Sequence, residues 1–282
     1  RDEAEDSREE RHIAIDGKSL RRTFDRAAGQ SMLHLVSAWS TANGITLGQV
    51  AVDEKSNEIT AIPRLLAIVD IRGATVTMDA MGNQKAIANA IIDGGGEYLL
   101  TVKGNQKKMQ QILQETLAEH FESDAPPPRG TRYETHEVKH GREETREYVS
   151  LPAPASLKKL GWSAVRSIGM VYSRTLRDGK VCEESRYYIS SRRPNARKLA
   201  TFSRRHWSIE NNLHWVLDVS FHEDLCRLRT GHSPENLALL NRIAVSLLKA
   251  DQTVKAGIAC KRKTAGWDDN YLIQLLLNNP SY

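Results

Sequence analysis

The sequence predicts an α/β protein with a mixed β-sheet that carries helices on its faces. Over the first 120 residues, short apolar and β-branched runs alternate with segments of helical spacing, in the order three strands, helix, strand, helix, strand, helix. Consecutive strands favour an antiparallel meander, and the later alternation favours parallel crossovers. A proline-rich junction at 124–130 is followed by strands over 132–191, and helical spacing returns at 195.

Local patterns set the elements of the first part of the chain. The Asn43-Gly44 step between two apolar runs is a hairpin signal. Asn83 is a candidate N-cap for the helix that follows it, and the glycines at 94–96 end that helix. The expected strands are 12–16, 31–41, 44–54, 74–82 and 97–105, and the expected helices are 62–71, 84–93 and 106–121.

The rest of the chain divides into a strand-rich part, a candidate β insertion, and a helical part. The Asp178-Gly179 step marks a hairpin turn within the strand-rich part. Ser233-Pro234 opens a helix, because proline is favoured in the first helical turn. The expected strands are 132–140, 145–151, 164–180 and 185–191, and the expected helices are 195–221, 234–250 and 268–277.

Composition excludes several classes of protein. The 282 residues are 40% hydrophobic and 27% charged, as in an ordinary soluble protein. No apolar run reaches the roughly 18 residues that span a bilayer. The three distant cysteines form neither a disulfide framework nor a zinc knuckle, which favours the reducing cytoplasm. The net charge of +5 suits a polyanionic partner such as nucleic acid. Residues 1–11, with six acids and three arginines, are expected to form a disordered acidic leader.

Three acids are candidate catalytic residues. Asp16 and Asp79 each end a predicted buried strand, and Glu210 lies in an amphipathic helix. A carboxylate in such a position is costly unless it is solvated, paired or metal-bound. Together the three carboxylates can hold two Mg²⁺ ions, which prefer oxygen ligands and promote phosphodiester cleavage when about 3.5–4 Å apart. The alternatives are two ordinary turn aspartates and a salt bridge from Glu210 to Arg205 or His206.

A basic cluster precedes Glu210. It comprises Arg192, Arg193, Arg197, Lys198, Arg204 and Arg205, which fall within 14 residues with no acid among them. On a helix these side chains suit contact with a phosphate backbone, and the alternative is a solvated charged face. Further cations lie near the same predicted sheet edge: Lys18, Arg21, Arg22, Lys103, Lys107 and Lys108.

A zinc site is a rival interpretation of the helical region. His214, Asp218 and His222 are spaced by four residues, which places them on one face of a continuous helix, and His206 and Glu223 are nearby. No HExxH motif or cysteine pair accompanies them, so a polar, hydrogen-bonded helix face is the favoured alternative.

Three long segments carry a family resemblance. The segments 13–25 (IAIDGKSLRRTFD), 78–106 (MDAMGNQKAIANAIIDGGGEYLLTVKGNQ) and 204–229 (RRHWSIENNLHWVLDVSFHEDLCRLR) resemble the ISAs-type insertion-sequence transposases, a group that includes the H-repeat-associated proteins. These are DDE transposases with an RNase H-like catalytic domain. The resemblance extends from about His12 to Leu248.

The resemblance implies a metal-dependent DNA strand-transfer enzyme. Asp16, Asp79 and Glu210 fall on the two aspartates and the glutamate of the family, with spacings of 63 and 131 residues. They would hold two Mg²⁺ ions, for which Mn²⁺ can substitute. One metal would activate water to nick the transposon end, and the released 3′-OH would attack target DNA. The implied layout is an acidic leader at 1–11, an RNase H-like core at 12–123, a β-rich insertion at 124–191, and the rest of the core with C-terminal helices at 192–282.

The resemblance also implies partners and surroundings. The expected partner is DNA, at the transposon ends and in the target, with no membrane, and paired-end chemistry favours a homodimer. The expected location is the bacterial cytoplasm, at the nucleoid. The candidate DNA contacts are Lys18, Arg204, Arg205, His206 and Asn211. Trp207 and Trp215 are expected to pack the helix that carries Glu210 on the sheet.

Two other hypotheses stay open. Family members usually carry a helical N-terminal segment where this sequence has the acidic leader, so one alternative is an inactive DNA-binding transposase remnant. Related transposases place Tyr, Arg and Lys around the glutamate, where this sequence has Ser203, His206 and Leu217. The roles of those flanking residues therefore do not carry over to this sequence. The other alternative is a structure-selective nuclease on the same fold.

Overall fold

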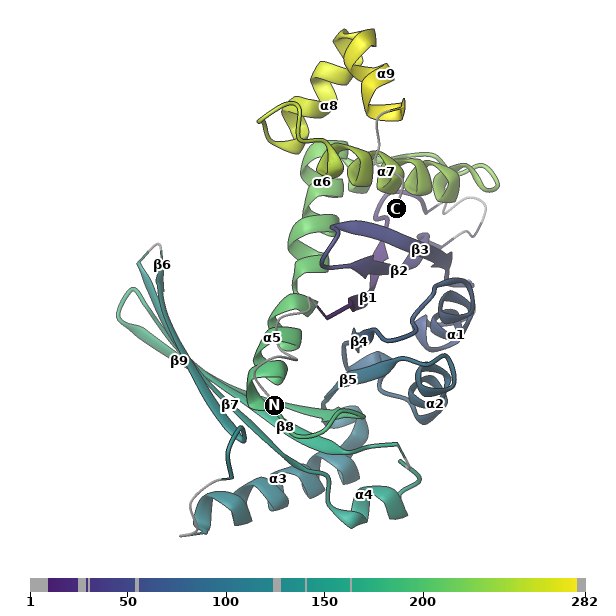
Figure 1. The fold of residues 1–282 in the computed structure, drawn as a ribbon. Coiled ribbons are helices and arrows are strands. Elements are labelled where there is room, and N and C mark those ends of the chain that lie inside the picture. Colours follow the sequence, from purple (N-terminus) through teal and green to yellow (C-terminus); the bar gives the residue numbers. More distant parts are fainter. Residues whose placement is uncertain are drawn as a thin grey trace. The chain divides into compact units, whose positions relative to one another are not determined.

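The fold is described from a computed structural model, which describes residues 10–24, 29, 31–53, 56–123, 128–139, 141–162 and 164–277. Residues 1–9 of the predicted leader and residues 124–127 of the predicted junction lie outside the described residues. The chain forms two compact units (Figure 1). The first combines residues 1–70 with 206–282, and the second is the continuous stretch 71–205.

Within its described residues, the first unit contains three antiparallel strands, ordered β3-β2-β1. They are β1 (His12–Ser19), β2 (His34–Ser40) and β3 (Ile45–Ala51). The predicted hairpin between β2 and β3 is confirmed, with Gly44 at a positive φ of 66°. The predicted end of the first strand at Asp16 is wrong, because Asp16 pairs with Ser37 and the ladder continues to Ser19. Gly17 does not interrupt the strand. It leaves room for the Glu58 carboxylate, with which a Cβ at this position would collide.

Helices pack against these strands and against one another. They are α1 (Glu58–Ile68), α6 (Trp215–Phe221), α7 (Ser233–Ala250), α8 (Ile258–Trp267) and α9 (Asp269–Leu277). Helix α1 begins four residues earlier than predicted because the Asn57 side chain accepts the Ile59 N–H at 3.1 Å and caps it. Helices α1 and α7 both contact β3. A core cluster joins Trp39 on β2 to Leu213, Leu217 and Val245.

The end of the first unit is tied together by a buried ion pair. Lys261 Nζ lies 3.1 Å from Asp251 Oδ2, and the Tyr271 hydroxyl donates to the same oxygen at 2.9 Å. Burial alone would raise the pKa of Asp251, but hydrogen bonds from Thr253, Tyr271 and Lys261 outweigh it and hold that pKa well below its ordinary value. Asp251 therefore stabilises the fold in its charged form.

We expect Asp251→Asn to lower the free energy of unfolding at pH 7 by about 3 kcal/mol, because it leaves Lys261 buried without its counter-charge. The folded-state pKa is depressed, so this stabilisation is complete above the unfolded pKa of about 3.9, decreases as the pH falls below that value, and is lost as the pH falls through the folded-state pKa. Urea unfolding at pH 7 and at pH 3 measures both effects. The control Asp53→Asn removes an exposed pair with Arg64 and should cost under about 1 kcal/mol. An equal loss for Asp251→Asn at both pH values would contradict the linkage.

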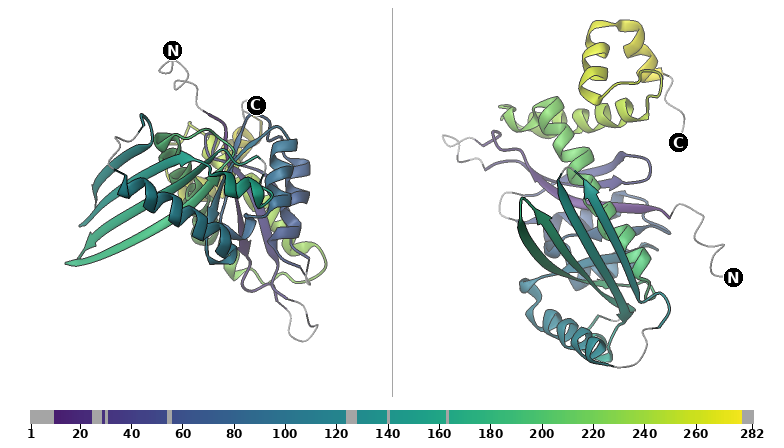
Figure 2. Two further views of the ribbon diagram at one scale, coloured as in Figure 1. Left: turned by 90° about the horizontal axis from the view of Figure 1, so that it is seen from below. Right: turned by 90° about the vertical axis from the view of Figure 1, so that its left-hand side faces the viewer.

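The part of the second unit that the structure describes has six strands in the order β4-β5-β9-β8-β7-β6. Strand β4 (Thr75–Met78) runs parallel to β5 (Glu97–Val102), and every later neighbour is antiparallel. The others are β6 (Arg132–Lys139), β7 (Arg142–Pro152), β8 (Ser167–Arg177) and β9 (Lys180–Ser190), a long ribbon that Figure 2 shows from two sides. The strand-rich part predicted for 132–191 thus joins β5 through β9.

The α-helices described alongside these strands are α2 (Lys85–Asp93), α3 (Lys107–Glu122), α4 (Ala155–Lys159) and α5 (Ala196–His206). Helix α2 contacts β5, and α3 contacts β8. Asn83 does not cap α2, because its side chain is buried and donates to the Thr101 carbonyl at 2.9 Å. The predicted turn at Asp178-Gly179 is confirmed, with both residues at positive φ. Together the helices and strands of the two units confirm the predicted α/β class, with both antiparallel and parallel strand pairs. None of the helices within the described ranges is long and apolar enough to cross a membrane.

Candidate functional site

Asp16 contacts the helical segment that carries Glu210. Its side chain points from the middle of β1, where the backbone is fixed by pairing with Ser37. The distance from Asp16 Oδ2 to His214 Nδ1 is 3.5 Å. His214 ends a π-helical turn, Glu210–His214, that begins at Glu210. The structure therefore places Asp16 beside the helical turn that begins with Glu210.

The π-helical turn explains how Glu210 faces outward from an otherwise apolar stripe. Ile209 and Leu213 are fully buried, whereas Glu210 is exposed. The Trp215 N–H bonds to the Glu210 carbonyl, one residue further along than in an α-helix. Such single π turns interrupt α-helices frequently at functional sites. The extra residue shifts the phase of the stripe after Glu210. The prediction that Trp207 and Trp215 pack on the sheet is wrong, because they are 40% and 60% exposed.

His214 is neutral at ordinary pH. Burial lowers the pKa of His214 to about 3, and the nearby positive charges of Arg242 and Lys18 lower it in the same direction. A neutral imidazole beside Asp16 forms no ion pair with that carboxylate. Sequence reasoning placed His214 near Glu210 by helical spacing but missed its contact with Asp16. That contact pairs a strand with a helix, and helical spacing alone carries no signal for it.

Lys18, two residues after Asp16 on β1, lies inside a cluster of carboxylates. Its ammonium is 2.8 Å from Asp218 and 3.0 Å from Asp224, with Glu223 at 3.9 Å. Its side chain is only 7% exposed. Asp16 and Lys18 share one face of the strand, and their partners His214 and Asp218 are four residues apart on the helix. The two contacts therefore hold strand and helix in register. A phosphate contact by Lys18 stays a prediction.

Asp79 follows β4 in the second unit and has a fixed orientation. Its Oδ1 accepts the Met81 N–H at 2.8 Å, which caps a short 3₁₀ turn. Asn105 Nδ2 donates to the Ala80 carbonyl at 2.8 Å, and Gln106 Nε2 donates to the Asn83 carbonyl at 2.9 Å. These amides tie the loop after β4 to the loop after β5. The repeated tripeptide Gly-Asn-Gln, at 82–84 and 104–106, is the sequence signal that marks the pair of loops. The convergence of Asp79 with the two acids of the first unit stays a prediction.

The donor chemistry of the three acids suits a hard cation. All three supply carboxylate oxygens, and Mg²⁺ is usually held by one or two carboxylates with water and substrate phosphates completing its shell. Among the described residues, no three histidine, cysteine or acidic side chains are gathered as a ready-made metal site. The spacing argument for zinc does not hold, because α6 ends at Phe221 and His222 follows in a left-handed conformation with φ 55°. His222 therefore leaves the face shared by His214 and Asp218.

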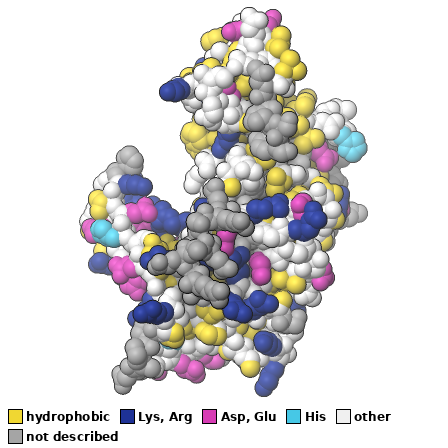
Figure 3. Space-filling model, in the orientation of Figure 1, with side chains coloured by type: hydrophobic (Ala, Val, Ile, Leu, Met, Phe, Trp, Pro, Cys, Tyr) yellow, Lys and Arg dark blue, Asp and Glu magenta, His cyan; other side chains and the backbone are white. Residues whose placement is uncertain are grey.

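The predicted DNA contacts lie in different surroundings. Arg204, on α5, is 2.8 Å from Glu137 on β6. In the first unit, the His206 ring lies edge-on to Trp207, with 6.3 Å between the ring centroids, and Asn211 is exposed beside Glu210. Arg205 is half-buried at the end of α5. Figure 3 shows lysine and arginine side chains in several groups on the face in view, with acidic side chains between them. DNA contact by these four residues stays a prediction.

The family of the chain follows from residues 7–247, which match the model of the transposase DDE domain. The chain belongs to the DDE transposase family. It is 39% identical over 270 residues to the “H repeat-associated putative transposase YhhI” of Escherichia coli K12, a match that covers 94% of this chain and 71% of that protein. The “Putative protein YbfL” of the same strain matches with the same identity and coverage. The resemblance to the H-repeat-associated transposases is thereby confirmed.

Solved structures give a weaker likeness for this DDE transposase chain. It aligns with one chain of a piggyBac transposase synaptic complex with hairpin DNA at 10% identity and a TM-score of 0.43. The alignment covers 96% of this chain and 52% of that chain. At this score the likeness does not establish a shared fold, and the family membership comes from the sequence relationship.

Proposed function

We propose that this chain is a DNA transposase that nicks DNA at insertion-sequence ends and joins the released 3′-OH to target DNA by transesterification. The observation that carries the proposal is the contact of Asp16 with His214, on the same π-helical turn as Glu210, in a chain of the DDE family. Asp16, Asp79 and Glu210 are the proposed catalytic acids. The proposed fold is an RNase H-like core whose strand-rich segment 124–191 is an insertion.

The proposed metal ligands are the same three carboxylates, which would hold two Mg²⁺ ions or Mn²⁺ in their place. Bound metal would supply a nucleophilic hydroxide and stabilise the leaving oxygen. The residues of the chain do the rest. The pairing of β1 with β2 fixes the Asp16 backbone, and the Met81 N–H orients the Asp79 carboxylate. Neutral His214 packs beside Asp16 without neutralising it. Rigid support of this kind holds reacting groups in productive geometry.

DNA is the proposed partner, with Arg204, Arg205, His206 and Asn211 as candidate contacts. Arginine, histidine and asparagine side chains donate hydrogen bonds to phosphate oxygens and base edges. The buried, carboxylate-bound ammonium of Lys18 makes it a weaker candidate, and its register contact with Asp218 is its better supported role. Paired ends make a homodimer the proposed assembly.

We expect metal-dependent nicking and joining by the wild-type chain and none by Asp79→Asn. The substitution keeps the size of the side chain and its capping oxygen but removes the negative charge that a divalent ion needs. Labelled linear DNA carrying the element's own ends, incubated with Mg²⁺ or Mn²⁺, measures both products. Equal products from both chains would exclude Asp79 as a metal ligand. DNA binding without products from wild type would favour the inactive DNA-binding alternative.

A further inference from the structure

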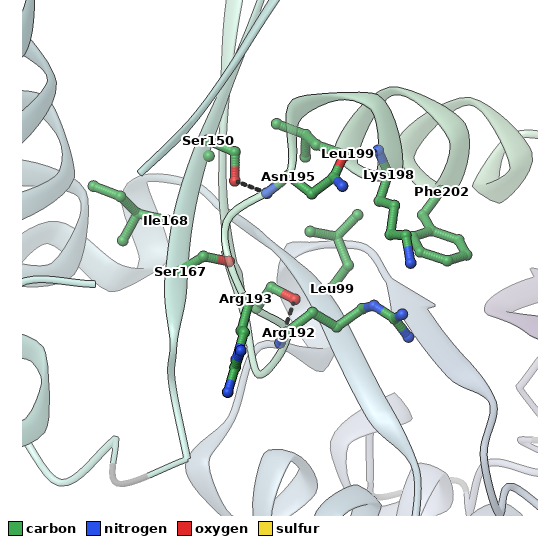
Figure 4. Close-up of a pocket in the computed structure, with 12 residues that line it drawn as sticks. Leu99, Ser150, Ser167, Ile168, Arg192, Arg193, Asn195, Lys198, Leu199 and Phe202 are labelled. Atoms are coloured by element: carbon green, nitrogen blue, oxygen red, sulfur yellow. Dashed lines mark hydrogen bonds between the residues drawn. The ribbon is translucent and has the colours of Figure 1, made fainter. Parts of the chain in front are cut away.

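A pocket in the second unit lies where α5 meets the strand ribbon, and all its lining residues come from this unit (Figure 4). Leu99, Ile168, Leu199 and Phe202 form its apolar lining. Gly169 on β8 allows the close approach of α5, because a Cβ there would lie 2.8 Å from Leu199 Cδ2. The helix and the ribbon thus meet over a small apolar base, which strengthens electrostatic interactions at the polar side of the pocket.

The polar lining of the pocket is cationic. Arg192, Arg193 and Lys198 line it, and none of its described lining residues is acidic. Arg192 Nη1 donates to the Thr75 hydroxyl at 2.9 Å, and its guanidinium lies 5.4 Å from the centre of the Phe202 ring. In Figure 4, the Arg192 and Lys198 side chains extend toward the same side of the pocket, and Arg193 extends in another direction. Three cations in one pocket create a local positive potential that attracts anions.

Hydroxyl groups fix the segment that carries these cations. The Ser150 hydroxyl accepts the Asn195 N–H at 3.1 Å, which Figure 4 shows as a dashed line. The Ser190 hydroxyl accepts the Arg192 N–H at 3.1 Å and donates to the Tyr98 carbonyl at 2.6 Å. The backbone of 190–195 is therefore anchored at both ends to the strands. Anchored cations bind a ligand with a smaller loss of conformational entropy than mobile ones.

The lining of the pocket indicates an anionic ligand, because its charged side chains are all cations. The pocket is partly open to solvent, so it suits a group that belongs to a larger molecule. Arginine, lysine, serine and asparagine are the side chains that contact DNA phosphates. We propose that this pocket binds the DNA backbone, with Arg192 and Lys198 at one phosphate group and Arg193 at a neighbouring one. The inference rests on the proposed function, and it adds a binding site to the second unit.

The structure divides the basic cluster of 192–205 into two faces. Arg197 precedes Lys198 on α5 but lies 5.5 Å over the ring of Tyr133, and Arg204 pairs with Glu137. Both partners are on β6, so these two arginines hold the helix on the ribbon. The pocket is on another face of α5, lined by Lys198. Adjacent residues of equal charge therefore have different roles, which gives the experiment a matched control.

We expect Arg193→Gln/Lys198→Gln to weaken DNA binding at least tenfold at 150 mM salt. Fluorescence anisotropy of a labelled duplex, in EDTA so that no cleavage occurs, measures the affinity. The loss of two phosphate contacts should also reduce the slope of log affinity against log salt by about 2. The control Lys158→Gln/Lys159→Gln removes the same charge from the exposed face of α4 and should change affinity less than threefold. Two single variants give a second comparison of DNA affinity. Lys198→Gln removes a charge that lines the pocket, and Arg197→Gln is its control because it removes an equal charge outside the pocket.

Exchanging arginine and lysine at the two pocket positions distinguishes an effect of charge on DNA binding from an effect on folding. Arg193→Lys/Lys198→Arg keeps both charges and should retain affinity within about threefold, with an unchanged melting temperature. Equal losses in the pocket pair and in the α4 pair would overturn the pocket site, because net charge would then explain both. Pocket-dependent binding without cleavage by wild type would support this site and refute the catalytic proposal. A wild-type chain that binds no DNA would refute both.

Discussion

Glu210→Gln is expected to lower the rate of DNA nicking by at least about 10³-fold. The neutral amide keeps the shape of the side chain but loses the charge that helps to hold a divalent ion. A loss of about 4 kcal/mol of transition-state stabilisation corresponds to this factor. Glu210 is exposed on its π-helical turn, with the buried residues Ile209 and Leu213 carrying the packing. The free energy of unfolding should therefore change by less than about 0.5 kcal/mol.

Single-turnover nicking with labelled DNA, together with urea unfolding and DNA-binding anisotropy, measures the three quantities on one preparation. Glu235→Gln is the control, because Glu235 is an acid in the first turn of a different helix, α7. It should leave the nicking rate within about twofold. A Glu210→Gln chain that fails to fold would make Glu210 a structural residue. A folded chain that nicks at the wild-type rate would remove Glu210 from the catalytic set.

The sequence predicted the order of strands and helices well where local chemistry decides it. The turns at Gly44 and Gly179 were predicted because their backbones need positive φ, which glycine supplies at low cost. Helix α8 was missed, since its sequence IACKRKTAGW is strongly cationic and has little helical periodicity. Asp16 was predicted at a strand end because Gly17 was interpreted as a break. Strand pairing overrode that local signal.

The candidate site was predicted in its acids but not in its supports. Carboxylates next to apolar runs are visible in a sequence, whereas contacts between distant segments are not. Lys18 and Asp224 are 206 residues apart, and no periodicity connects them. The π-helical turn at Glu210–His214 also has no simple residue signature, and the burial predicted for Trp215, which follows it, was wrong. Family resemblance located the acids, and only the three-dimensional structure gives their neighbours.

Arg242→Met is expected to lower the free energy of unfolding by about 3–5 kcal/mol, because it leaves a buried carboxylate without its main partner. Arg242, on α7, is 1% exposed, and its Nη1 donates to Glu223 Oε1 at 3.0 Å. Its Nε donates to the Ser37 hydroxyl at 3.2 Å. Burial lowers the pKa of Arg242, and the negative charge of Glu223 opposes that shift. After the substitution, Glu223 Oε2 would still have the Lys18 ammonium at 3.9 Å.

The double variant Arg242→Met/Glu223→Met removes both buried charges, so it should recover most of the lost stability. Urea unfolding of the wild type, both single variants and the double variant gives the coupling free energy. Arg64→Met, which breaks the exposed pair with Asp53, should cost under about 1 kcal/mol. Additive losses would mean that the two residues act independently. Strong coupling would show that Arg242 anchors α7 through Glu223. Glu223 also lies 3.9 Å from Lys18, on the strand that presents Asp16, so the same buried network joins α7 to the strand of the candidate catalytic acid.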